Sequence, residues 1–345
     1  MSHNWPLYII AFAMSLFITL FTTPVAKKLS IKFGAIDYPK DRGIHKKPMP
    51  RMGGVAIVFG FMVTVFVLIR FVDEVNYSQF IGLVVGSLII AVLGMVDDTR
   101  NLPARFKLAV QIIAAIIVVI SGTRMHIIQL PMNSFLRVFS IPITIIWIVG
   151  VTNAVNLIDG MDGLASGVSA IASLCIMILC FITGSEMAVF LSAVLAGSCI
   201  GFLPRNFNPA EIFMGDTGST FLGFVLAVTS IMGVFKGYTI LALVVTILCL
   251  GLPIFDTLFA IGRRVKNHKP IMQPDRGHMH HRLIDKGFSQ KQAAVILYGV
   301  SAICGLVAII IIAKSPPAIV ITIIMVVGLS YVIHLFMKRN HNRRR

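Results

Sequence analysis

Long apolar runs separated by short polar segments fill the sequence. Crossing a hydrocarbon core takes about 20 apolar residues per helix, and only helices or closed barrels satisfy the backbone in lipid. The runs therefore predict an all-α integral membrane protein, a single polytopic domain over residues 1–345 with about eleven transmembrane helices. The expected helices cover about 5–26, 53–71, 79–96, 106–122, 139–155, 164–184, 187–203, 218–235, 239–262, 292–313 and 317–337.

Basic residues predict the orientation of these helices. With eleven crossings, 25 of the 30 Lys and Arg residues fall on one side of the membrane, which should face the cytoplasm. The N-terminus is then expected outside and the basic C-terminal tail inside. The polar segments on the cytoplasmic side, expected to carry the catalytic residues, are about 27–52, 97–106, 156–163, 204–217 and 263–291.

Composition supports a membrane protein over a nucleic-acid-binding one. The chain is 57% hydrophobic and 13% charged, about half the charged fraction of a soluble domain. The net charge of +16 comes from basic residues between apolar runs, where they set topology. No nucleic-acid partner is expected.

Acidic residues gather on the predicted cytoplasmic side, which holds eleven of the 14. The segment GMVDDT places Asp97 beside Asp98, and adjacent carboxylates repel each other unless a cation compensates. Lys107 and Arg105, or a hard divalent cation such as Mg²⁺, would meet that need. A solvated helix cap explains the pair equally well.

A second polar cluster lies in the segment NAVNLIDGMDGLA, which supplies Asn153, Asn156, Asp159 and Asp162. The last three recur every three residues, so a helical turn would place them on one face. Amides with carboxylates suit hydrogen bonding to a base or sugar as well as metal binding. A structural turn is the alternative.

A third cluster lies in the segment NFNPAEIFMGDTGS, with Asn208 near its start and Asp216 between glycines before an apolar run. Gly and Asp ahead of a helix predict a cap with exposed amides that suit phosphate, or plain N-capping. The segment PRMGG places Arg51 at the start of the second run, either as a site residue or as part of a topogenic loop.

The segment PDRGHMHHRL brings three histidines and two arginines into one loop. His278, His280 and His281 would suit a transition metal, but no cysteine is near and the flanking Arg276 and Arg282 would repel a cation. Arg with His favours polyphosphate. A solvated loop is the alternative.

The segment PIFDT contributes one further acid near the inner end of the ninth run. Pro253 is expected to kink that helix. For Asp256, an ion pair with Arg263 or Arg264 is favoured over metal binding.

All four clusters are predicted on the same side of the membrane, and this favours an enzyme over a transporter or a structural protein. Acid pairs with Arg and His on one membrane face favour a metal-dependent reaction between a charged cytosolic molecule and a lipid-borne group. A transporter would place polar residues in mid-membrane on broken helices, and a structural scaffold explains none of the clusters. A lipid phosphatase is a rival among enzymes.

At these motifs the sequence resembles the polyprenyl-phosphate N-acetylhexosamine-1-phosphate transferases, of the glycosyltransferase 4 type. PRMGG, GMVDD, NAVNLIDGMDGLA and NPAEIFMGDTGS occur in order, and the resemblance covers roughly residues 5–335. The loop GHMHHRLIDKGFSQKQ resembles the branch that initiates teichoic acid, enterobacterial common antigen or O-antigen synthesis. The peptidoglycan branch carries three consecutive histidines followed by Phe-Glu, whereas Met279 interrupts them here.

The resemblance implies the reaction and its partners. Undecaprenyl phosphate would attack the β-phosphate of a UDP-N-acetylhexosamine, UDP-GlcNAc foremost, releasing UMP and leaving a lipid-linked pyrophosphoryl sugar. The family requires Mg²⁺ or Mn²⁺, is inhibited by tunicamycin, and acts at the cytoplasmic face of the bacterial inner membrane among its lipids. A homodimer is also consistent with the family.

The resemblance also implies roles for the residues named above. Asp216 would bind Mg²⁺ with Asp97 and Asp98 beside it, Asp97 would be the base toward the lipid phosphate, and Lys107 would bind phosphate. Asn156, Asp159 and Asp162 would hold the uridine end. His280 is expected to be a catalytic residue that, with its neighbours, contacts the sugar and pyrophosphate. The remaining predicted substrate contacts are Arg51, Asn153, Asn208, Arg276, His278 and His281.

Overall fold

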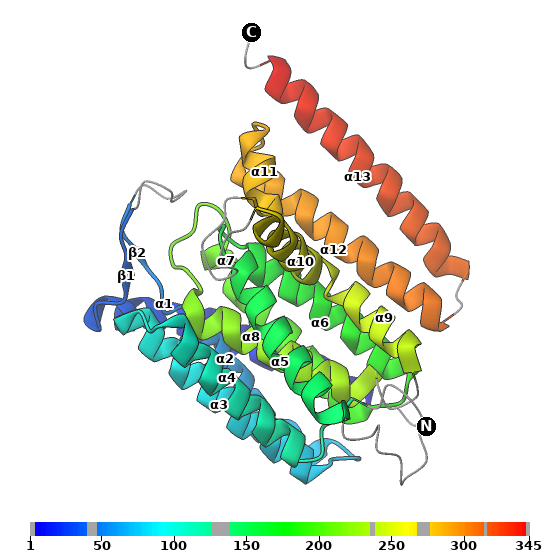
Figure 1. Cartoon of the computed structure of the whole chain (residues 1–345). Coiled ribbons are helices and arrows are strands. Elements are labelled where there is room, and N and C mark those ends of the chain that lie inside the picture. The colour runs from blue at the N-terminus through cyan, green and yellow to red at the C-terminus, as the bar shows by residue number, and fades with distance from the viewer. Residues whose placement is uncertain are drawn as a thin grey trace.

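A computed structural model shows an almost entirely helical protein (Figure 1). It describes residues 4–39, 47–125, 139–234, 239–267, 277–313 and 316–342. The first eight helices are α1 (Trp5–Lys32), α2 (Gly54–Leu68), α3 (Tyr77–Arg100), α4 (Ala104–Ile120), α5 (Ser140–Ile158), α6 (Leu164–Ile182), α7 (Glu186–Asn206) and α8 (Gly215–Val234). The others are α9 (Thr239–Cys249), α10 (Gly251–Lys266), α11 (Met279–Asp285), α12 (Gln290–Ala313) and α13 (Pro316–Asn342).

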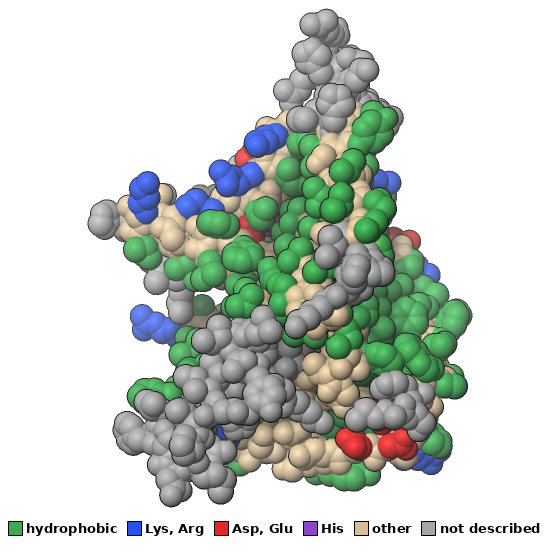
Figure 2. Space-filling view, turned by 90° about the vertical axis from the view of Figure 1, so that its right-hand side faces the viewer, with side chains coloured by type: hydrophobic (Ala, Val, Ile, Leu, Met, Phe, Trp, Pro, Cys, Tyr) green, Lys and Arg blue, Asp and Glu red, His purple; other side chains and the backbone are tan. Residues whose placement is uncertain are grey.

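The predicted helical membrane architecture is confirmed in its main features. Each predicted apolar run overlaps a helix, and seven helices are long and apolar enough to cross a membrane among the described residues. The count of eleven crossings and the outward N-terminus stay predictions. Figure 2 shows hydrophobic side chains over the broad middle of one face, with Lys and Arg side chains near its upper left.

Four details differ from the predicted pattern. The run 239–262 is two helices, because α9 ends at Cys249, the residue whose carbonyl the ring of Pro253 would meet in a continuous helix. The predicted loop 263–291 contains the short helix α11. The predicted loop 27–52 contains a two-stranded antiparallel sheet, β1 (Ile36–Asp37) with β2 (Met49–Pro50), and a 3-10 turn at Ile69–Phe71 follows α2.

The core forms around α7 and α8, whose side chains are buried along most of their length. Helix α7 packs against α1, α2, α6 and α8, while α8 also packs against α3 and α5. The aromatic rings of Phe190, Phe202, Phe221 and Phe224 are fully buried there. Helix α13 packs on α12, at the edge of the molecule (Figure 1).

Glycine allows the start of α8 to lie directly against α2. A Cβ added to Gly54 would overlap the backbone nitrogen of Gly218. Such a contact brings backbone against backbone, so neither helix can keep its place if a side chain intervenes. The close approach fixes the N-terminus of α8 beside the start of α2.

Gly54→Val should therefore separate α2 from α8 and lower the stability of the protein by about 1–3 kcal/mol, the usual range for overpacking. The thermal unfolding midpoint of the purified protein in detergent would measure the loss. Gly150→Val is the matched control, because nothing lies within 4 Å of its added Cβ. Equal midpoints for both variants would contradict the proposed close packing.

Candidate active site

The carboxylate of Asp98, at the end of α3, caps the N-terminus of α8. It accepts hydrogen bonds from the backbone N–H of Asp216 (2.9 Å), the backbone N–H of Thr217 (3.0 Å) and the Thr217 hydroxyl (2.6 Å). The first N–H groups of a helix have no partner within the helix, so a buried carboxylate there satisfies them and the positive end of the helix dipole. Asp98 thereby fixes the first turn of α8.

Arg51, which follows β2, ties that strand to the C-terminal end of α3. Its Nε donates to the backbone carbonyl of Asp98 (2.8 Å), and its Nη2 donates to the side chain of Asn101 (2.9 Å). Gly215 sits between these groups with a φ of +70°, and an added Cβ would meet the Arg51 carbonyl. Glycine is therefore favoured at position 215 both because φ is positive there and because no space exists for a side chain.

Lys107, on the first turns of α4, bridges two acids. Its Nζ lies 2.8 Å from Asp97 Oδ2 and 2.8 Å from Asp216 Oδ2. The other oxygen of Asp97 accepts the N–H of Leu102 at 2.6 Å, so Asp97 is held on both sides. This network places an ammonium group on α4 next to a carboxylate on α8.

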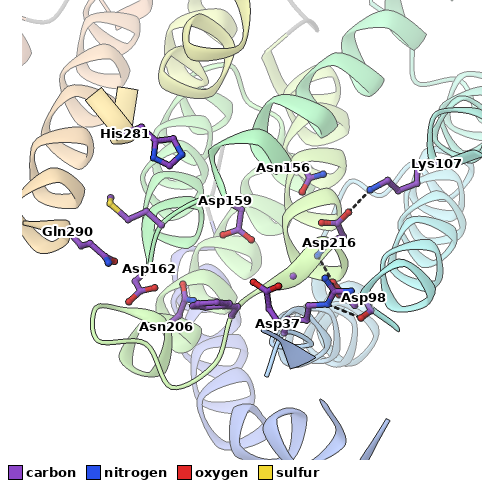
Figure 3. Close-up of a pocket in the computed structure, with 15 residues that line it drawn as sticks. Asp37, Asp98, Lys107, Asn156, Asp159, Asp162, Asn206, Asp216, His281 and Gln290 are labelled. Carbon is purple, nitrogen blue, oxygen red and sulfur yellow. Dashed lines mark hydrogen bonds and ion pairs between the residues drawn. The ribbon is translucent and has the colours of Figure 1, made fainter. Parts of the chain in front are cut away.

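The end of α5 and the turn that follows it supply the second predicted cluster. The side-chain oxygen of Asn156 accepts the Ser219 hydroxyl (2.7 Å), which ties α5 to α8. Asp159 is half-buried and faces the same space as Asp216 (Figure 3). Burial, and then the negative charges of nearby carboxylates led by Asp216, raise the pKa of Asp159 to about 8.

Asp162 is fixed from the other side by the loop before α8. Its Oδ2 accepts the Asn208 side-chain amide (2.9 Å) and the backbone N–H of Ala210 (3.1 Å). Asn208 also donates to Gln290 at the start of α12 (3.1 Å). Asn208, predicted as a substrate contact, therefore has a demonstrated place in holding Asp162.

Most of these groups line one cavity of about 480 Å³ (Figure 3). The fold brings residues from distant polar segments to this one place. Of the predicted site residues, the cavity is lined by Arg51, Asp98, Lys107, Asn156, Asp159, Asp162, Asp216 and His281. The predicted residues Asp97, Asn153, Asn208, His278 and His280 are not among its lining groups, and Arg276 lies outside the described residues.

Asn153 pairs with a neighbouring helix. Its side-chain amide donates to Gln111 Oε1 at 2.7 Å and to the Val149 carbonyl at 2.8 Å. Gln111 is 3% exposed on α4. The pair satisfies two buried amides between α4 and α5, which is the packing role expected of polar groups between membrane helices.

The three histidines of the predicted phosphate loop have different surroundings. His281 lines the cavity, whereas His278 and His280 are buried with exposed fractions of 5% and 2%. Burial, and then the neighbouring histidines, lower the pKa of His280 to about 3, so its ring is neutral.

Several lining residues carry no sequence signal of their own. Asp37, in β1, lies within the predicted catalytic segment 27–52 but outside any motif. Asn206 and Gln290 are neutral amides at helix ends, and Met161 and Phe213 are apolar. Their proximity to the acids depends on the fold.

The donor set of the cavity suits a hard divalent cation. Four carboxylates line it besides the cap Asp98, namely those of Asp37, Asp159, Asp162 and Asp216. No group of three or more His, Cys, Asp or Glu able to hold a metal occurs in the described part of the chain. Magnesium commonly takes only one or two protein carboxylates and completes its shell with water and substrate phosphate, so the residues fit.

Asp98→Ala should destabilise the protein by about 2 kcal/mol, because it leaves the first N–H groups of α8 without an acceptor. Asp216→Ala should cost less, since Lys107 retains Asp97 and a repelled carboxylate disappears. Thermal unfolding of the two purified variants in detergent tests this order. An equal or larger loss for Asp216→Ala would contradict the capping role.

Comparison with known proteins agrees with this geometry. Residues 80–234 match the model of glycosyl transferase family 4. The chain is 40% identical over 306 residues to "Probable undecaprenyl-phosphate N-acetylglucosaminyl 1-phosphate transferase" of Bacillus subtilis, covering 88% of this chain and 84% of that protein. It is 34% identical over 312 residues to "Decaprenyl-phosphate N-acetylglucosaminephosphotransferase" of Mycolicibacterium smegmatis, covering 81% and 76%.

A peptidoglycan-branch protein is also related. The "Phospho-N-acetylmuramoyl-pentapeptide-transferase" of Staphylococcus aureus is 29% identical over 305 residues, covering 82% of this chain and 91% of that protein. The N-acetylglucosaminyl relatives named above match at higher identity. The chain therefore belongs to glycosyl transferase family 4, in the branch of the polyprenyl-phosphate N-acetylglucosaminyl 1-phosphate transferases.

Proposed function

We propose that this chain transfers N-acetylglucosamine 1-phosphate from UDP-GlcNAc to undecaprenyl phosphate, releasing UMP. The observation that carries the proposal is the Lys107 ammonium held between Asp97 and Asp216 on the wall of a polar cavity in an otherwise apolar bundle. A cation at that place suits two reacting phosphates. The product is the first lipid-linked intermediate of a cell-surface polysaccharide.

The names of the relatives support both substrates. The Bacillus subtilis relative is named for an undecaprenyl acceptor and the Mycolicibacterium smegmatis relative for a decaprenyl one, while both names specify N-acetylglucosamine. The common chemistry is a polyprenyl phosphate acceptor. The apolar helices would hold its tail at the inner membrane, and we place the cavity at the cytoplasmic face, where the donor is found.

Charge neutralisation and alignment are the chemical needs of this reaction. An oxygen of the lipid phosphate attacks the β-phosphorus of the donor, and the bond from that phosphorus to the bridging oxygen breaks, so that UMP leaves. Lys107 would bind the phosphates while Asp97 keeps its ammonium in place. We retain Asp97 as the predicted base, although a phosphate monoester is already mostly ionised near pH 7.

Residues on different walls of the cavity would contact different parts of the UDP-sugar donor. Asn156, Asp159 and Asp162 offer amide and carboxylate groups to the uridine end. His281, at the upper left in Figure 3, would face the sugar and pyrophosphate. Arg51 approaches Asp98 Oδ1 to 4.0 Å and also lines the cavity, which suits phosphate contact.

The cavity would hold Mg²⁺ or Mn²⁺ through Asp216, with Asp159 facing the same space. When bound, such a cation supplies positive charge that neutralises the pyrophosphate. Asp97 would hold Lys107 near this cation, and Asp98 would hold the first turn of α8 there. Direct ligation by those two acids stays a prediction, because the structure gives their oxygens other hydrogen-bond donors.

Purified protein given undecaprenyl phosphate and UDP-GlcNAc should release UMP and form a lipid-linked sugar in the presence of Mg²⁺. Excess EDTA should abolish both products, since two carboxylates and a lysine leave the pyrophosphate charge uncompensated. UMP by chromatography and the lipid product by mass spectrometry provide independent readouts.

Other donors distinguish the alternatives. Release of UMP only from UDP-MurNAc-pentapeptide would contradict the donor and indicate the peptidoglycan branch. No UMP from any UDP-sugar, with transport of lipid-linked sugar in vesicles, would contradict the transferase. UMP release unaffected by EDTA would contradict the metal.

Asp216→Asn should lower the rate of UMP release by about 100-fold or more, the usual cost of losing a charge contact in a transition state. Glu211→Gln is the matched control: its carboxylate lies in the same predicted segment 204–217 but is exposed and pairs with Lys27 and Arg205 at the surface. Turnover of Asp216→Asn within a few-fold of Glu211→Gln would remove Asp216 from the reaction centre.

A further inference from the structure

Asp256, on α10, holds the start of α11 through two hydrogen bonds. Its Oδ2 lies 2.8 Å from His278 Nδ1, and its Oδ1 accepts the backbone N–H of Met279 at 2.8 Å. Asp256 is 2% exposed and His278 5% exposed, so both groups are removed from solvent and from the cavity. Each oxygen of one carboxylate thus fixes a different group at the same helix end.

Helix α10 is itself fixed to the site. It packs against α5, the helix that ends just before Asp159. Its buried positions Asp256, Ala260 and Arg264 recur every four residues and form one stripe, while Leu258 and Phe259 are exposed on the other side. The carboxylate therefore projects from a face that is packed within the protein.

A continuous set of rings leads from this carboxylate to the cavity. The His278 and His280 rings are stacked with centroids 5.8 Å apart, and the His280 and His281 centroids are 4.3 Å apart. The ring of His280 rests against Gly160, where an added Cβ would lie 2.7 Å from Nε2. Only the last ring, that of His281, lines the cavity.

We propose that Asp256 is a positioning residue for the donor side of the reaction: it anchors α11 through His278 and thereby sets the place of His281 in the cavity. His278 acts as an anchor and His280 as a packed spacer, so His281 is the histidine of this segment that contacts the donor. This inference rests on the proposed donor site. It assigns different roles to three histidines that look equivalent in the sequence.

The position of the anchor predicts which kinetic constant responds. Lys107, Asp97 and Asp216 do not contact Asp256 in the described network, so the phosphate centre keeps its geometry when the anchor is lost. Asp256→Ala should raise the KM for UDP-GlcNAc about tenfold and change the KM for undecaprenyl phosphate less than twofold. Asp256→Asn should stay within about threefold of wild type, because its oxygen accepts the Met279 N–H and its amide donates to His278.

Asp285→Ala is the matched control, since Asp285 is an exposed acid at the other end of α11. Its two KM values should equal those of wild type. His278→Ala removes the other half of the anchor and should give the same KM split, which keeps the test decisive if Asp256→Ala does not fold. Thermal unfolding of each purified variant accompanies the kinetics.

A double variant tests whether Asp256 acts through His281. The donor KM of Asp256→Ala/His281→Ala should be within twofold of that of His281→Ala. Multiplied effects, or an equal rise in both KM values for Asp256→Ala and His278→Ala, would overturn the positioning role. A raised donor KM in His281→Ala with wild-type constants in the anchor variants would overturn this inference alone, whereas an unchanged donor KM in His281→Ala would contradict the donor placement itself.

Discussion

The capping of α8 by the Asp98 carboxylate is the interaction on which the site depends. A helix that begins inside an apolar bundle needs acceptors for its first N–H groups, and the end of α3 supplies them. Gly94 on α3 and Gly215 leave room for this approach, because an added Cβ would meet the Thr217 backbone at the first and the Asp98 carboxylate at the second. Because the N–H of Asp216 is one of the donors, the cap also fixes the acid that we assign to the cation.

Capping a helix with a carboxylate beside the cavity has an electrostatic consequence. A carboxylate used as a cap lies next to another that faces the cavity, and the cavity walls add Asp37, Asp159 and Asp162. Burial, and then repulsion by the neighbouring carboxylates, raise the pKa of Asp159, and the same concentration of negative charge disfavours an anionic donor on its own. Under the proposed function we therefore expect the donor and a divalent cation to favour each other's binding, which suits a reaction between two phosphates.

The sequence predicted most of the helices because long apolar runs permit few alternatives. It also predicted that the acids meet on one side, since the positions of Lys and Arg fix which helix ends are together. The partner of each acid could not be predicted, because a carboxylate that caps a distant helix, such as Asp98, has the same local pattern as one that binds metal. For the same reason the local pattern does not predict that Gln111, 42 residues away, accepts the amide hydrogen bond of Asn153.

Helix α11, with seven residues, shows a limit of prediction from local sequence pattern. A helix this short is unstable alone, because nucleation fixes the backbone of several residues in return for few hydrogen bonds. Its sequence alone therefore predicts a loop. Tertiary contacts must therefore set its position: Asp256 holds its start and Gly160 leaves room for its His280 ring. Contacts from α10 and from the α5–α6 turn thus give the helix its order, and they also determine that the next ring, of His281, faces the cavity.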